Sequence, residues 1–492
     1  MDTALEWLTW LHFAALGAFS LYGLHRLVTL RRWWELRGGP TPTPSLPADY
    51  QEPMVTVQLP VFNERFVIAR LIDCVARLDW PEGKLEIQVL DDSIDETTAI
   101  VEERVAYWLD RGTRIAHIRR THRGGYKAGA LTAGTAEAKG EFIAIFDADF
   151  TPTPDFLRNT MPHFADGGVG MVQIRWSFDN ADHSWLTRIQ AMLLGAHFSV
   201  EHQVRYRRKL FFNFNGTAGV WRRRAIEEAG GWQSDTVTED LDLSYRAQLS
   251  GWRFIYLDSC EAPSELPITL SALRRQQQRW AKGSVQTARK LLPRILGGPW
   301  PSVLKVEAVA HLLANVCWLL GVVIFLTLHP AVLTRVGIGP WQIVRIDLPL
   351  FMATSFAVFL FFAVHSAASG GRVPLRHAVL LPVLTIGLAP AIALSVLGGM
   401  WMQGGAFRRT PKFGAASGAG MPPQAGVYHH REWRHVAVNF VLFFYSLLPL
   451  QFAWERGTWY AVPFFSLFPL GFMVAILAET REKFGAANGT GA

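Results

Sequence analysis

The chain has 492 residues, of which half are hydrophobic and 18% are charged, and its formal net charge is +7. The length exceeds what one small core needs, and the apolar excess at the N-terminus and after residue 300 argues against a soluble protein. The positive charge lies mostly near predicted membrane ends or inside the polar block, so the positive-inside bias explains it without a nucleic-acid ligand. Three cysteines with no CxxC pair argue against a disulfide scaffold or a zinc site.

The first predicted element is an apolar run at residues 5–30, which is long enough to span a bilayer. A cleaved signal peptide is the alternative. Positive charge follows the run, however, whereas Asp2 and Glu6 precede or begin it. This order favours an uncleaved anchor whose C-terminal end lies in the cytoplasm. A Pro-rich stretch at 38–47 then leads into the polar block.

Short apolar or β-branched runs alternate with helical stretches in the first half of the polar block. The runs are 54–60, 85–90 and 141–146, and the helical stretches are 64–78, 96–111 and 125–138. This alternation predicts a mostly parallel sheet with helices on both faces. Ligands of such sheets bind beyond the carboxyl ends of the strands, where several aspartates follow the runs.

Longer helical and apolar segments follow the predicted sheet. Residues 185–203 and 268–296 are predicted to form amphipathic helices, and the second suits a membrane surface. Further full spans are expected near 304–328, 348–368, 436–454 and 458–478. With the first span they make five crossings, which place the N-terminus outside and the C-terminus inside.

Residues 378–402 are also apolar and long enough to cross, which would give a sixth crossing. Basic residues flank both ends of this segment, so both ends are expected in the cytoplasm. Pro382, Gly387 and Pro390 are able to break a helix. We therefore expect a re-entrant or interfacial helix pair here.

Two aspartates, Asp147 and Asp149, follow the predicted strand at 141–146. Alternation along an extended backbone puts both carboxylates on the same side. Their hard oxygen atoms suit Mg²⁺ or Mn²⁺, which would bridge to a nucleotide diphosphate. A DxD triplet is also common in solvated loops, but its position at a strand end favours a functional site.

Other residues near the predicted strand ends suit a nucleotide. Asp91 and Asp92 offer acceptors to a base or a ribose, although such a pair also caps helices. Pro60 and Glu64 follow the first strand, where a ribose or base would be contacted. Lys127 is able to neutralise a phosphate, although a lone lysine is usually only solvated.

The catalytic candidates are Asp240 and its neighbour Glu239. Sugar transfer with inversion requires a hydroxyl group to attack the anomeric carbon from the side opposite the leaving diphosphate. A carboxylate within hydrogen-bond reach takes the proton of that hydroxyl, while a metal and basic side chains stabilise the charge on the diphosphate. The preceding Thr238 is alternatively a helix N-cap, which is compatible with catalysis.

Gln276, Arg279 and Trp280 occupy positions i, i+3 and i+4 of the predicted helix at 268–296, so they share one face. Arginine offers forked donors to phosphate, and tryptophan offers a flat apolar surface to a sugar ring. Anchoring at the membrane surface is the alternative role for the arginine and the tryptophan.

The loop after residue 402 contains Phe407, Thr410 and Lys412 within six residues. An aromatic ring, a hydroxyl group and cations this close together are able to close over a bound nucleotide. An ordinary basic loop beside the membrane is the alternative.

Taken together, these motifs resemble the cellulose synthase superfamily of inverting family-2 glycosyltransferases. DD, DxD, TED and QxxRW occur in the family's order. The strings LPVFNE, GYKAGAL, AIFDADFTPTPDFL and FNGTAGVWR are closest to the cellulose-synthase-like A and C types, which make mannan, glucomannan and xyloglucan backbones. The resemblance covers roughly residues 53–283.

The resemblance implies an α/β GT-A domain, with a mostly parallel sheet flanked by helices, on an α-helical transmembrane domain. It implies nucleotide contacts from Asp91 or Asp92, a metal role for Asp149 and a diphosphate or ribose role for Asp147. Asp240 would be the general base.

The resemblance also implies roles for two later motifs. The acceptor and diphosphate end would be lined by Gln276, Arg279 and Trp280. Phe407, Thr410 and Lys412 match an FxxTxK pattern similar to the family's gating loop, in which Arg409 stands where cellulose synthases have valine.

The expected organisation has five parts. They are an N-terminal transmembrane helix at 1–35, a Pro-rich linker at 36–52, a cytoplasmic GT-A domain at 53–265, interfacial helices with QxxRW at 266–300, and a transmembrane region at 301–492 that includes a gating-like loop at 403–430.

We expect a processive β-glycosyltransferase of the inner or plasma membrane. It would extend a polysaccharide from UDP-glucose or GDP-mannose with Mg²⁺ or Mn²⁺, and pass the product through the bilayer. The alternative is a non-processive enzyme that adds one sugar to a membrane lipid. A transporter or receptor without catalysis is disfavoured by the joint presence of DxD, TED and QxxRW. The expected partners are a nucleotide-sugar donor, a glycan or lipid acceptor and the bilayer, with no nucleic acid.

Overall fold

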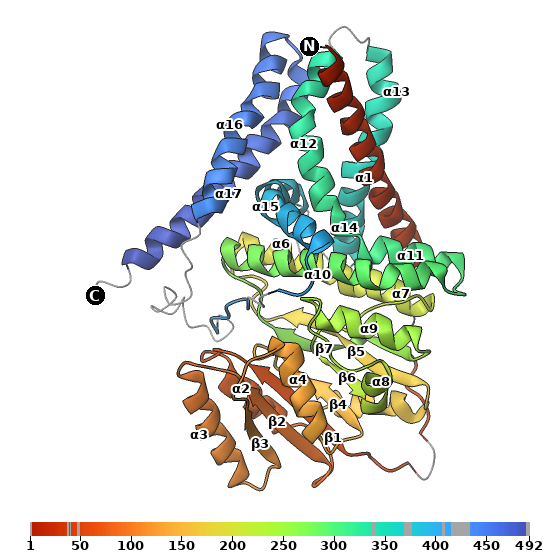
Figure 1. Ribbon diagram of the computed structural model, residues 1–492, viewed down its shortest axis with the longest axis vertical. Helices are drawn as coiled ribbons and strands as arrows, with labels where there is room; N and C mark the ends of the chain where they lie inside the picture. Colours follow the sequence, from red (N-terminus) through yellow and green to blue (C-terminus); the bar gives the residue numbers. More distant parts are fainter. Residues whose placement is uncertain are drawn as a thin grey trace.

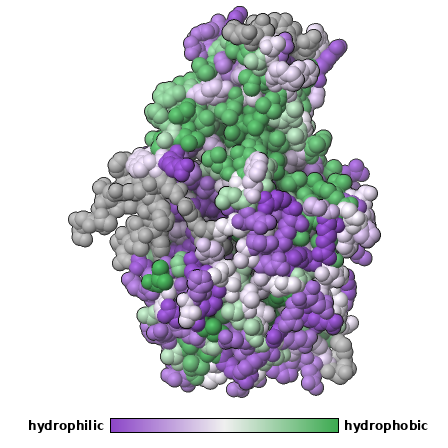
Figure 2. Space-filling view, in the orientation of Figure 1, coloured by the Kyte–Doolittle hydropathy of each residue, from purple (hydrophilic) through white to green (hydrophobic). Residues whose placement is uncertain are grey.

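The computed structural model describes residues 2–36, 39, 41–46, 50–335, 340–368, 376–405, 409–414 and 433–488. It consists of a helical part and an α/β part stacked end to end (Figure 1). Hydrophobic side chains gather on the surface of the helical part, and hydrophilic side chains cover most of the α/β part (Figure 2). This distribution is the one expected of a membrane-embedded part and a water-exposed part.

The α/β part is built on a seven-stranded sheet in the order β3-β2-β1-β4-β6-β5-β7. The strands are β1 (Val55–Val61), β2 (Leu85–Asp91), β3 (Ile115–Arg119), β4 (Phe142–Ile145), β5 (Val169–Phe178), β6 (Gly219–Arg222) and β7 (Arg253–Ser264). Strand β6 is antiparallel to both β4 and β5, and the other pairs are parallel. The predicted mostly parallel sheet is confirmed.

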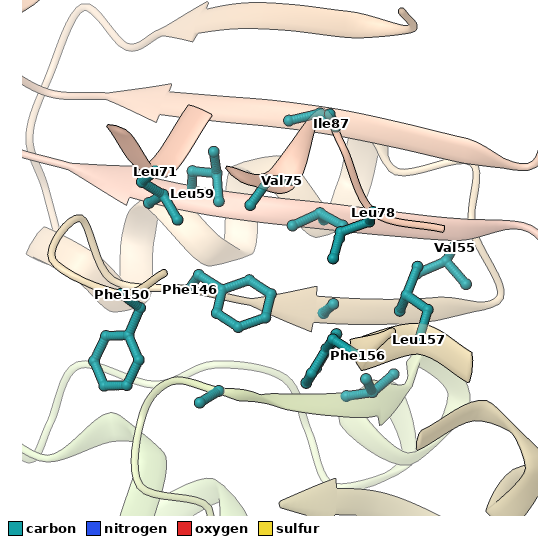
Figure 3. Packing of buried hydrophobic residues seen from close by; sticks show 14 of the residues in the cluster. Val55, Leu59, Leu71, Val75, Leu78, Ile87, Phe146, Phe150, Phe156 and Leu157 are labelled. Atoms are coloured by element: carbon teal, nitrogen blue, oxygen red, sulfur yellow. The ribbon is translucent and has the colours of Figure 1, made fainter. Parts of the chain in front are cut away.

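Short helices cover this sheet and bury its core. They are α2 (Ile68–Val75), α3 (Thr97–Leu109), α4 (Tyr126–Glu137), α5 (Phe156–Thr160), α8 (Arg223–Glu228) and α9 (Glu239–Leu249). Figure 3 shows Leu59 of β1 packed with Leu71 and Val75 of α2, and Phe146 packed with Phe156. All five are almost fully buried. Each such side chain contributes about 1.5–3 kcal/mol of hydrophobic stabilisation, which fixes the strand ends that carry the acidic motifs.

A layer of helices joins the two parts (Figure 1). It contains α6 (Trp185–Ala196), the π-helix η2 (His197–His202), α7 (Gln203–Arg207), α10 (Leu270–Gly297) and α11 (Ser302–Leu312). The prediction of a span over 304–328 is wrong at its start, because α11 ends at Leu312 and the apolar helix α12 begins only at Val316.

Six helices among the described residues are long and apolar enough to cross a membrane. They fall in α1 (Asp2–Leu36), α12 (Val316–Thr334), α13 (Pro340–Phe351) continued by η3 (Met352–Phe356) and α14 (Ala357–Ala368), α15 (Arg376–Trp401), α16 (Trp433–Glu455) and α17 (Val462–Asn488).

The predicted helix pair after α14 is instead one helix, α15, which runs from Arg376 to Trp401 through Pro382 and Pro390. Proline removes one helical hydrogen bond, but neighbouring helices often satisfy the exposed backbone groups in an apolar setting. Here the Asn439 side chain of α16 donates to the carbonyl of Gly387 at 3.2 Å. The expectation of a break was therefore wrong, because α15 continues through both prolines.

Helix α15 packs against α10, α12 and α17, above the layer of helices that joins the two parts (Figure 1). The chain approaches α15 from this side, because His365 in the last turns of α14 lies against Gly195 of α6. It also leaves on this side, because the backbone N–H of Gly404 donates to the carbonyl of Asp235 at 2.6 Å. The segments before and after α15 thus contact the joining layer of helices and the α/β part, respectively.

Candidate functional site

A cavity of about 150 Å³, here called the polar cavity, lies where the carboxyl ends of β1 and β4 meet α9 and α10. Its wall contains most of the predicted site residues. These are Pro60, Glu64, Asp92, Lys127, Asp147, Asp149, Glu239, Asp240, Gln276, Arg279, Trp280, Thr410 and Lys412. Segments that are about 350 residues apart in the chain therefore share one cleft.

Asp147 and Asp149 reach the polar cavity from a turn that follows β4. The predicted extended backbone is wrong here, because the N–H of Phe150 donates to the carbonyl of Asp147 at 3.0 Å. The turn is fixed at Asp147, whose N–H donates to the Thr217 hydroxyl at 2.9 Å. The two carboxylates share the cavity wall because the chain folds back.

Each of these carboxylates contacts a lysine. Lys127 donates to Oδ1 of Asp147 at 2.5 Å, and Lys412 donates to Oδ2 of Asp149 at 2.6 Å. No group of three or more His, Cys, Asp or Glu residues that could hold a metal is found in the described part of the chain. A cation held by these two carboxylates would complete its shell with phosphate and water oxygens, as Mg²⁺ commonly does. The residues therefore fit a divalent cation that is shared with a diphosphate.

Of the predicted nucleotide-binding pair, Asp92 lines the polar cavity and Asp91 does not. Asp91 is 1% exposed. Its carboxylate accepts hydrogen bonds from the Ser93 N–H at 2.8 Å and from the Thr98 hydroxyl at 3.0 Å, and its Oδ2 lies 3.0 Å from Nε2 of His117. Burial raises the pKa of Asp91, but these hydrogen bonds more than offset it and bring the pKa to about 2. The structure thus corrects the prediction for Asp91, which holds the loop after β2 in place.

Asp240 lies in the first turn of α9, with Thr238 at the N-cap position. Burial and the neighbouring Glu239 raise the pKa of Asp240 to about 7, against the opposing charges of Lys127 and Arg279. A carboxylate with a pKa near the working pH is well suited to take a proton from a hydroxyl group. Its position and raised pKa therefore suit Asp240 to the general-base role that the sequence predicts.

The pH dependence of turnover provides a test of this role. Since Asp240 must be deprotonated to act, activity should fall as the pH drops through about 7. Lys127→Met removes a cation that lowers the Asp240 pKa. In this variant the loss of activity should therefore occur at a higher pH. The measurement is a kcat/KM profile, with Glu64→Gln as a control because Glu64 also has a pKa of about 7. If Glu64→Gln no longer loses activity as the pH drops, the titrating group is Glu64 and not Asp240.

The QxxRW residues lie on one face of α10. Its N-terminal region is anchored by the buried ion pair of Arg274 with Glu479 on α17. Gln276, Arg279 and Trp280 then line the polar cavity. The helix thus carries a basic and an aromatic side chain from the helical part into the cleft.

The predicted gating loop is described only from residue 409 to 414, so Phe407 lies outside the described residues. Thr410 and Lys412 line the polar cavity. The side chain of Arg409 forms an ion pair with the buried carboxylate of Glu64. The arginine that replaces the family's valine therefore has its own partner across the cleft.

Several residues of this cleft were not predicted. Glu265 holds the 409–414 segment, since its Oε2 accepts from the N–H groups of Phe413 and Gly414 at 3.3 and 3.1 Å. Gly216 lies between Asp240 and Lys127, and its φ of +83° is in the left-handed region. Only the string FNGTAGVWR contained a signal for it, because an Asn-Gly pair often marks such a turn.

Replacing Gly216 with alanine should reduce activity strongly without loss of the fold. The new Cβ would lie 2.9 Å from Oδ2 of Asp240 and 3.5 Å from Nζ of Lys127, and the φ value adds backbone strain of about 1 kcal/mol. The measurement is the transfer rate beside the thermal unfolding midpoint. Gly167→Ala is the matched control, because nothing lies within 4 Å of its added Cβ. Wild-type activity in Gly216→Ala would contradict the close packing around Asp240.

A second and larger cavity of about 1460 Å³, here called the transmembrane cavity, lies among the helices of the helical part. It extends from Asp240 to Arg335 at the end of α12, and most of its wall is apolar. Seven residues line both cavities: Trp176, Leu194, Asn215, Thr238, Asp240, Gln276 and Trp280. The carboxylate of Asp240 thus lies where the two cavities meet.

Comparison with known proteins gives this geometry a context. Residues 142–367 match the model of a family described as Glycosyl transferase family group 2. Over these residues the chain matches a family-2 glycosyltransferase domain. The resemblance to family-2 glycosyltransferases that the sequence motifs indicated is confirmed.

Two curated relatives extend the likeness. The chain is 46% identical over 252 residues to Glucomannan 4-beta-mannosyltransferase 1 of Oryza sativa subsp. japonica. It is 47% identical over 249 residues to Glucomannan 4-beta-mannosyltransferase 2 of Arabidopsis thaliana. Each alignment covers 50% of this chain and 48% or 47% of the relative, so the chain spans about half the length of the curated relatives it matches.

A solved structure supports the fold of this glycosyltransferase domain. The mannosyltransferase PcManGT from Pyrobaculum calidifontis, in complex with GDP-Man and Mn²⁺, superposes with a TM-score of 0.53 at 21% sequence identity. The match covers 80% of this chain and 99% of that chain. The predicted GT-A fold with a helical membrane part is confirmed.

Proposed function

We propose that the protein is a membrane-embedded, inverting β-glycosyltransferase that extends a polysaccharide and passes it into the transmembrane cavity. The observation that supports this most is the position of Asp240, whose side chain lines both cavities. A donor bound in the polar cavity and an acceptor bound in the transmembrane cavity would meet at this carboxylate.

The polar cavity has the charges that a nucleotide diphosphate requires. Asp147 and Asp149 would hold Mg²⁺ or Mn²⁺, which neutralises charge on the diphosphate when bound. Lys127, Arg279 and Lys412 line the same wall and offer cationic donors to phosphate oxygens. The base and ribose would lie toward Asp92, which follows β2 and lines the same cavity.

The reaction follows from the position of Asp240. The acceptor hydroxyl donates its proton to this carboxylate and its oxygen forms a bond to the anomeric carbon. The bond from that carbon to the diphosphate oxygen breaks on the opposite side, and the electron pair leaves with the diphosphate. Lys127, whose pKa is lowered by burial but raised overall by Asp147 and Glu239, remains a cation beside the leaving group.

The helical part would place the product path across the bilayer. We propose five crossings, with α15 lying at the cytoplasmic surface, because the segments before and after α15 contact the joining layer and the α/β part. The α/β part then lies in the cytoplasm, where nucleotide sugars are found. The N-terminus lies outside and the C-terminus lies inside.

A donor screen with the purified protein tests the proposal. GDP-mannose and UDP-glucose would be supplied separately with Mn²⁺ or Mg²⁺, and products would be sized and digested with linkage-specific glycanases. The names of the curated relatives include mannosyltransferase, which favours GDP-mannose over UDP-glucose as the donor. Long β-linked chains from GDP-mannose are therefore expected. The apolar wall of the transmembrane cavity favours a lipid acceptor as the second candidate. A product with a single sugar on a lipid would show a lipid glycosyltransferase and contradict polymer synthesis. Donor binding without any transfer would contradict both candidate functions.

A further inference from the structure

The π-helix η2 lies beside the junction of the two cavities. It spans His197–His202 and separates α6 from α7. Such π-helical turns are rare in proteins. Those that do occur are often found at functional sites. Two polar side chains of this turn, His197 and Glu201, line the transmembrane cavity near Asp240.

Glu201 fixes the orientation of His197. The buried carboxylate of Glu201 pairs with Arg26 of α1, and with Arg205 at 3.5 Å. Its Oε2 also lies 3.2 Å from Nδ1 of His197. Burial and the nearby charges of Arg205 and Arg26 lower the pKa of His197 to about 3, so the ring is neutral. A neutral ring that donates from Nδ1 to a carboxylate presents Nε2 as an acceptor.

A second acceptor faces this nitrogen. Nε2 of His197 lies 3.5 Å from Oδ1 of Asn215, while Nδ2 of Asn215 lies 2.6 Å from Nε2 of His202. The contact with His202 keeps the amide oxygen of Asn215 directed at His197. Oδ1 of Asn215 already accepts from Nδ2 of Asn213 at 3.1 Å, so the acceptor that still needs a donor is Nε2 of His197. A hydroxyl group of a ligand supplies that donor.

Unsatisfied polar atoms surround the same junction. Oγ1 of Thr238, Oε1 of Gln276 and Oδ1 of Asn213 are buried and have no hydrogen-bond partner in the described part of the chain. All three residues line the transmembrane cavity. A buried oxygen left unpaired costs about 1–3 kcal/mol, so several together indicate a ligand with many hydroxyl groups.

We propose that His197 and Asn215 form a subsite that binds a hydroxyl group of the terminal hexose of the acceptor, and that Glu201 orients His197 for this contact. This inference rests on the proposed function, because it assigns the acceptor to the transmembrane side of Asp240. His197 binds the acceptor and takes no part in proton transfer.

The test compares two substitutions of His197 in the full-length, purified protein. His197→Phe keeps the ring shape and removes both nitrogens, whereas His197→Gln keeps a polar atom near the position of Nε2. With a soluble mannan or glucan oligosaccharide as acceptor, the KM for the acceptor should rise about tenfold or more in His197→Phe. It should rise less in His197→Gln, and the KM for the donor should change little in both. His163→Gln is the control, since His163 is a buried histidine that lines neither cavity.

Each result has a distinct meaning. An unchanged acceptor KM in His197→Phe would overturn the subsite, and so would an equal rise of the donor KM, which indicates a structural role. Equal acceptor KM values in the Phe and Gln variants would also overturn the role of Nε2. If the wild-type protein transfers sugar to no oligosaccharide but binds the donor, the proposed function fails first and the subsite falls with it.

Discussion

Asp240→Asn should reduce sugar transfer by about 10²–10⁴-fold while leaving donor binding almost unchanged. Asparagine has the same shape as aspartate, so it fits the first turn of α9, but its amide does not accept the proton of an attacking hydroxyl. The loss should therefore appear in kcat, and the KM for the donor should stay within about twofold. The measurement is steady-state transfer together with calorimetric binding of the nucleoside diphosphate.

Asp235→Asn is the matched control for this change. It removes the same charge a few residues earlier, at a partly exposed side chain that pairs with Lys290 and lines neither cavity. Near-wild-type turnover is expected for this control. Unchanged turnover in Asp240→Asn would remove Asp240 as the base, and weakened donor binding would show that it holds the nucleotide.

Asp149→Ala should abolish metal-dependent transfer. The change removes a carboxylate that would hold the cation, and it also removes the contact with Lys412 and with the N–H of Glu265 at 3.2 Å. Both effects weaken the binding of the diphosphate. The measurement is activity during a Mn²⁺ titration, in which the variant should show no saturable rise. Asp155→Ala is the control, since Asp155 lies beside α5 and outside the polar cavity.

A chelator completes this test. Treatment with a chelator should stop the wild-type enzyme, and added Mn²⁺ or Mg²⁺ should restore it. Activity that is insensitive to the chelator and to Asp149→Ala would refute the metal assignment. A variant that regains activity at high Mn²⁺ would instead show that Asp147 holds most of the cation.

The sequence predicted those parts of the fold that depend on local pattern. The runs at 54–60 and 85–90 became β1 and β2, because short runs rich in apolar and β-branched residues are typical of strands buried on both faces. Strand β3 (Ile115–Arg119) was not predicted, since it is short and only its first residue is fully buried. The break between α11 and α12 was not predicted. Both helices are apolar, and a hydropathy pattern does not distinguish two apolar helices joined by a short turn from one long helix.

The candidate site was predictable at strand ends and less so elsewhere. Asp91 and Asp92 are consecutive, so alternation sends their side chains in opposite directions, and only the fold shows that Asp92 faces the cleft. The roles of Asn215 and His197 depend on contacts between distant segments. A sequence pattern does not reveal a π-turn such as η2, which is a local irregularity stabilised by tertiary packing.

A cryo-electron microscopy structure of the enzyme during synthesis tests the central claim most directly. The protein would be incubated with donor and Mn²⁺, and then arrested with the nucleoside diphosphate. We predict that a glycan occupies the transmembrane cavity, with its terminal sugar between Asp240 and His197 and the nucleotide beside Asp147 and Asp149. Density for a glycan that leaves the polar cavity away from the membrane helices would contradict the account.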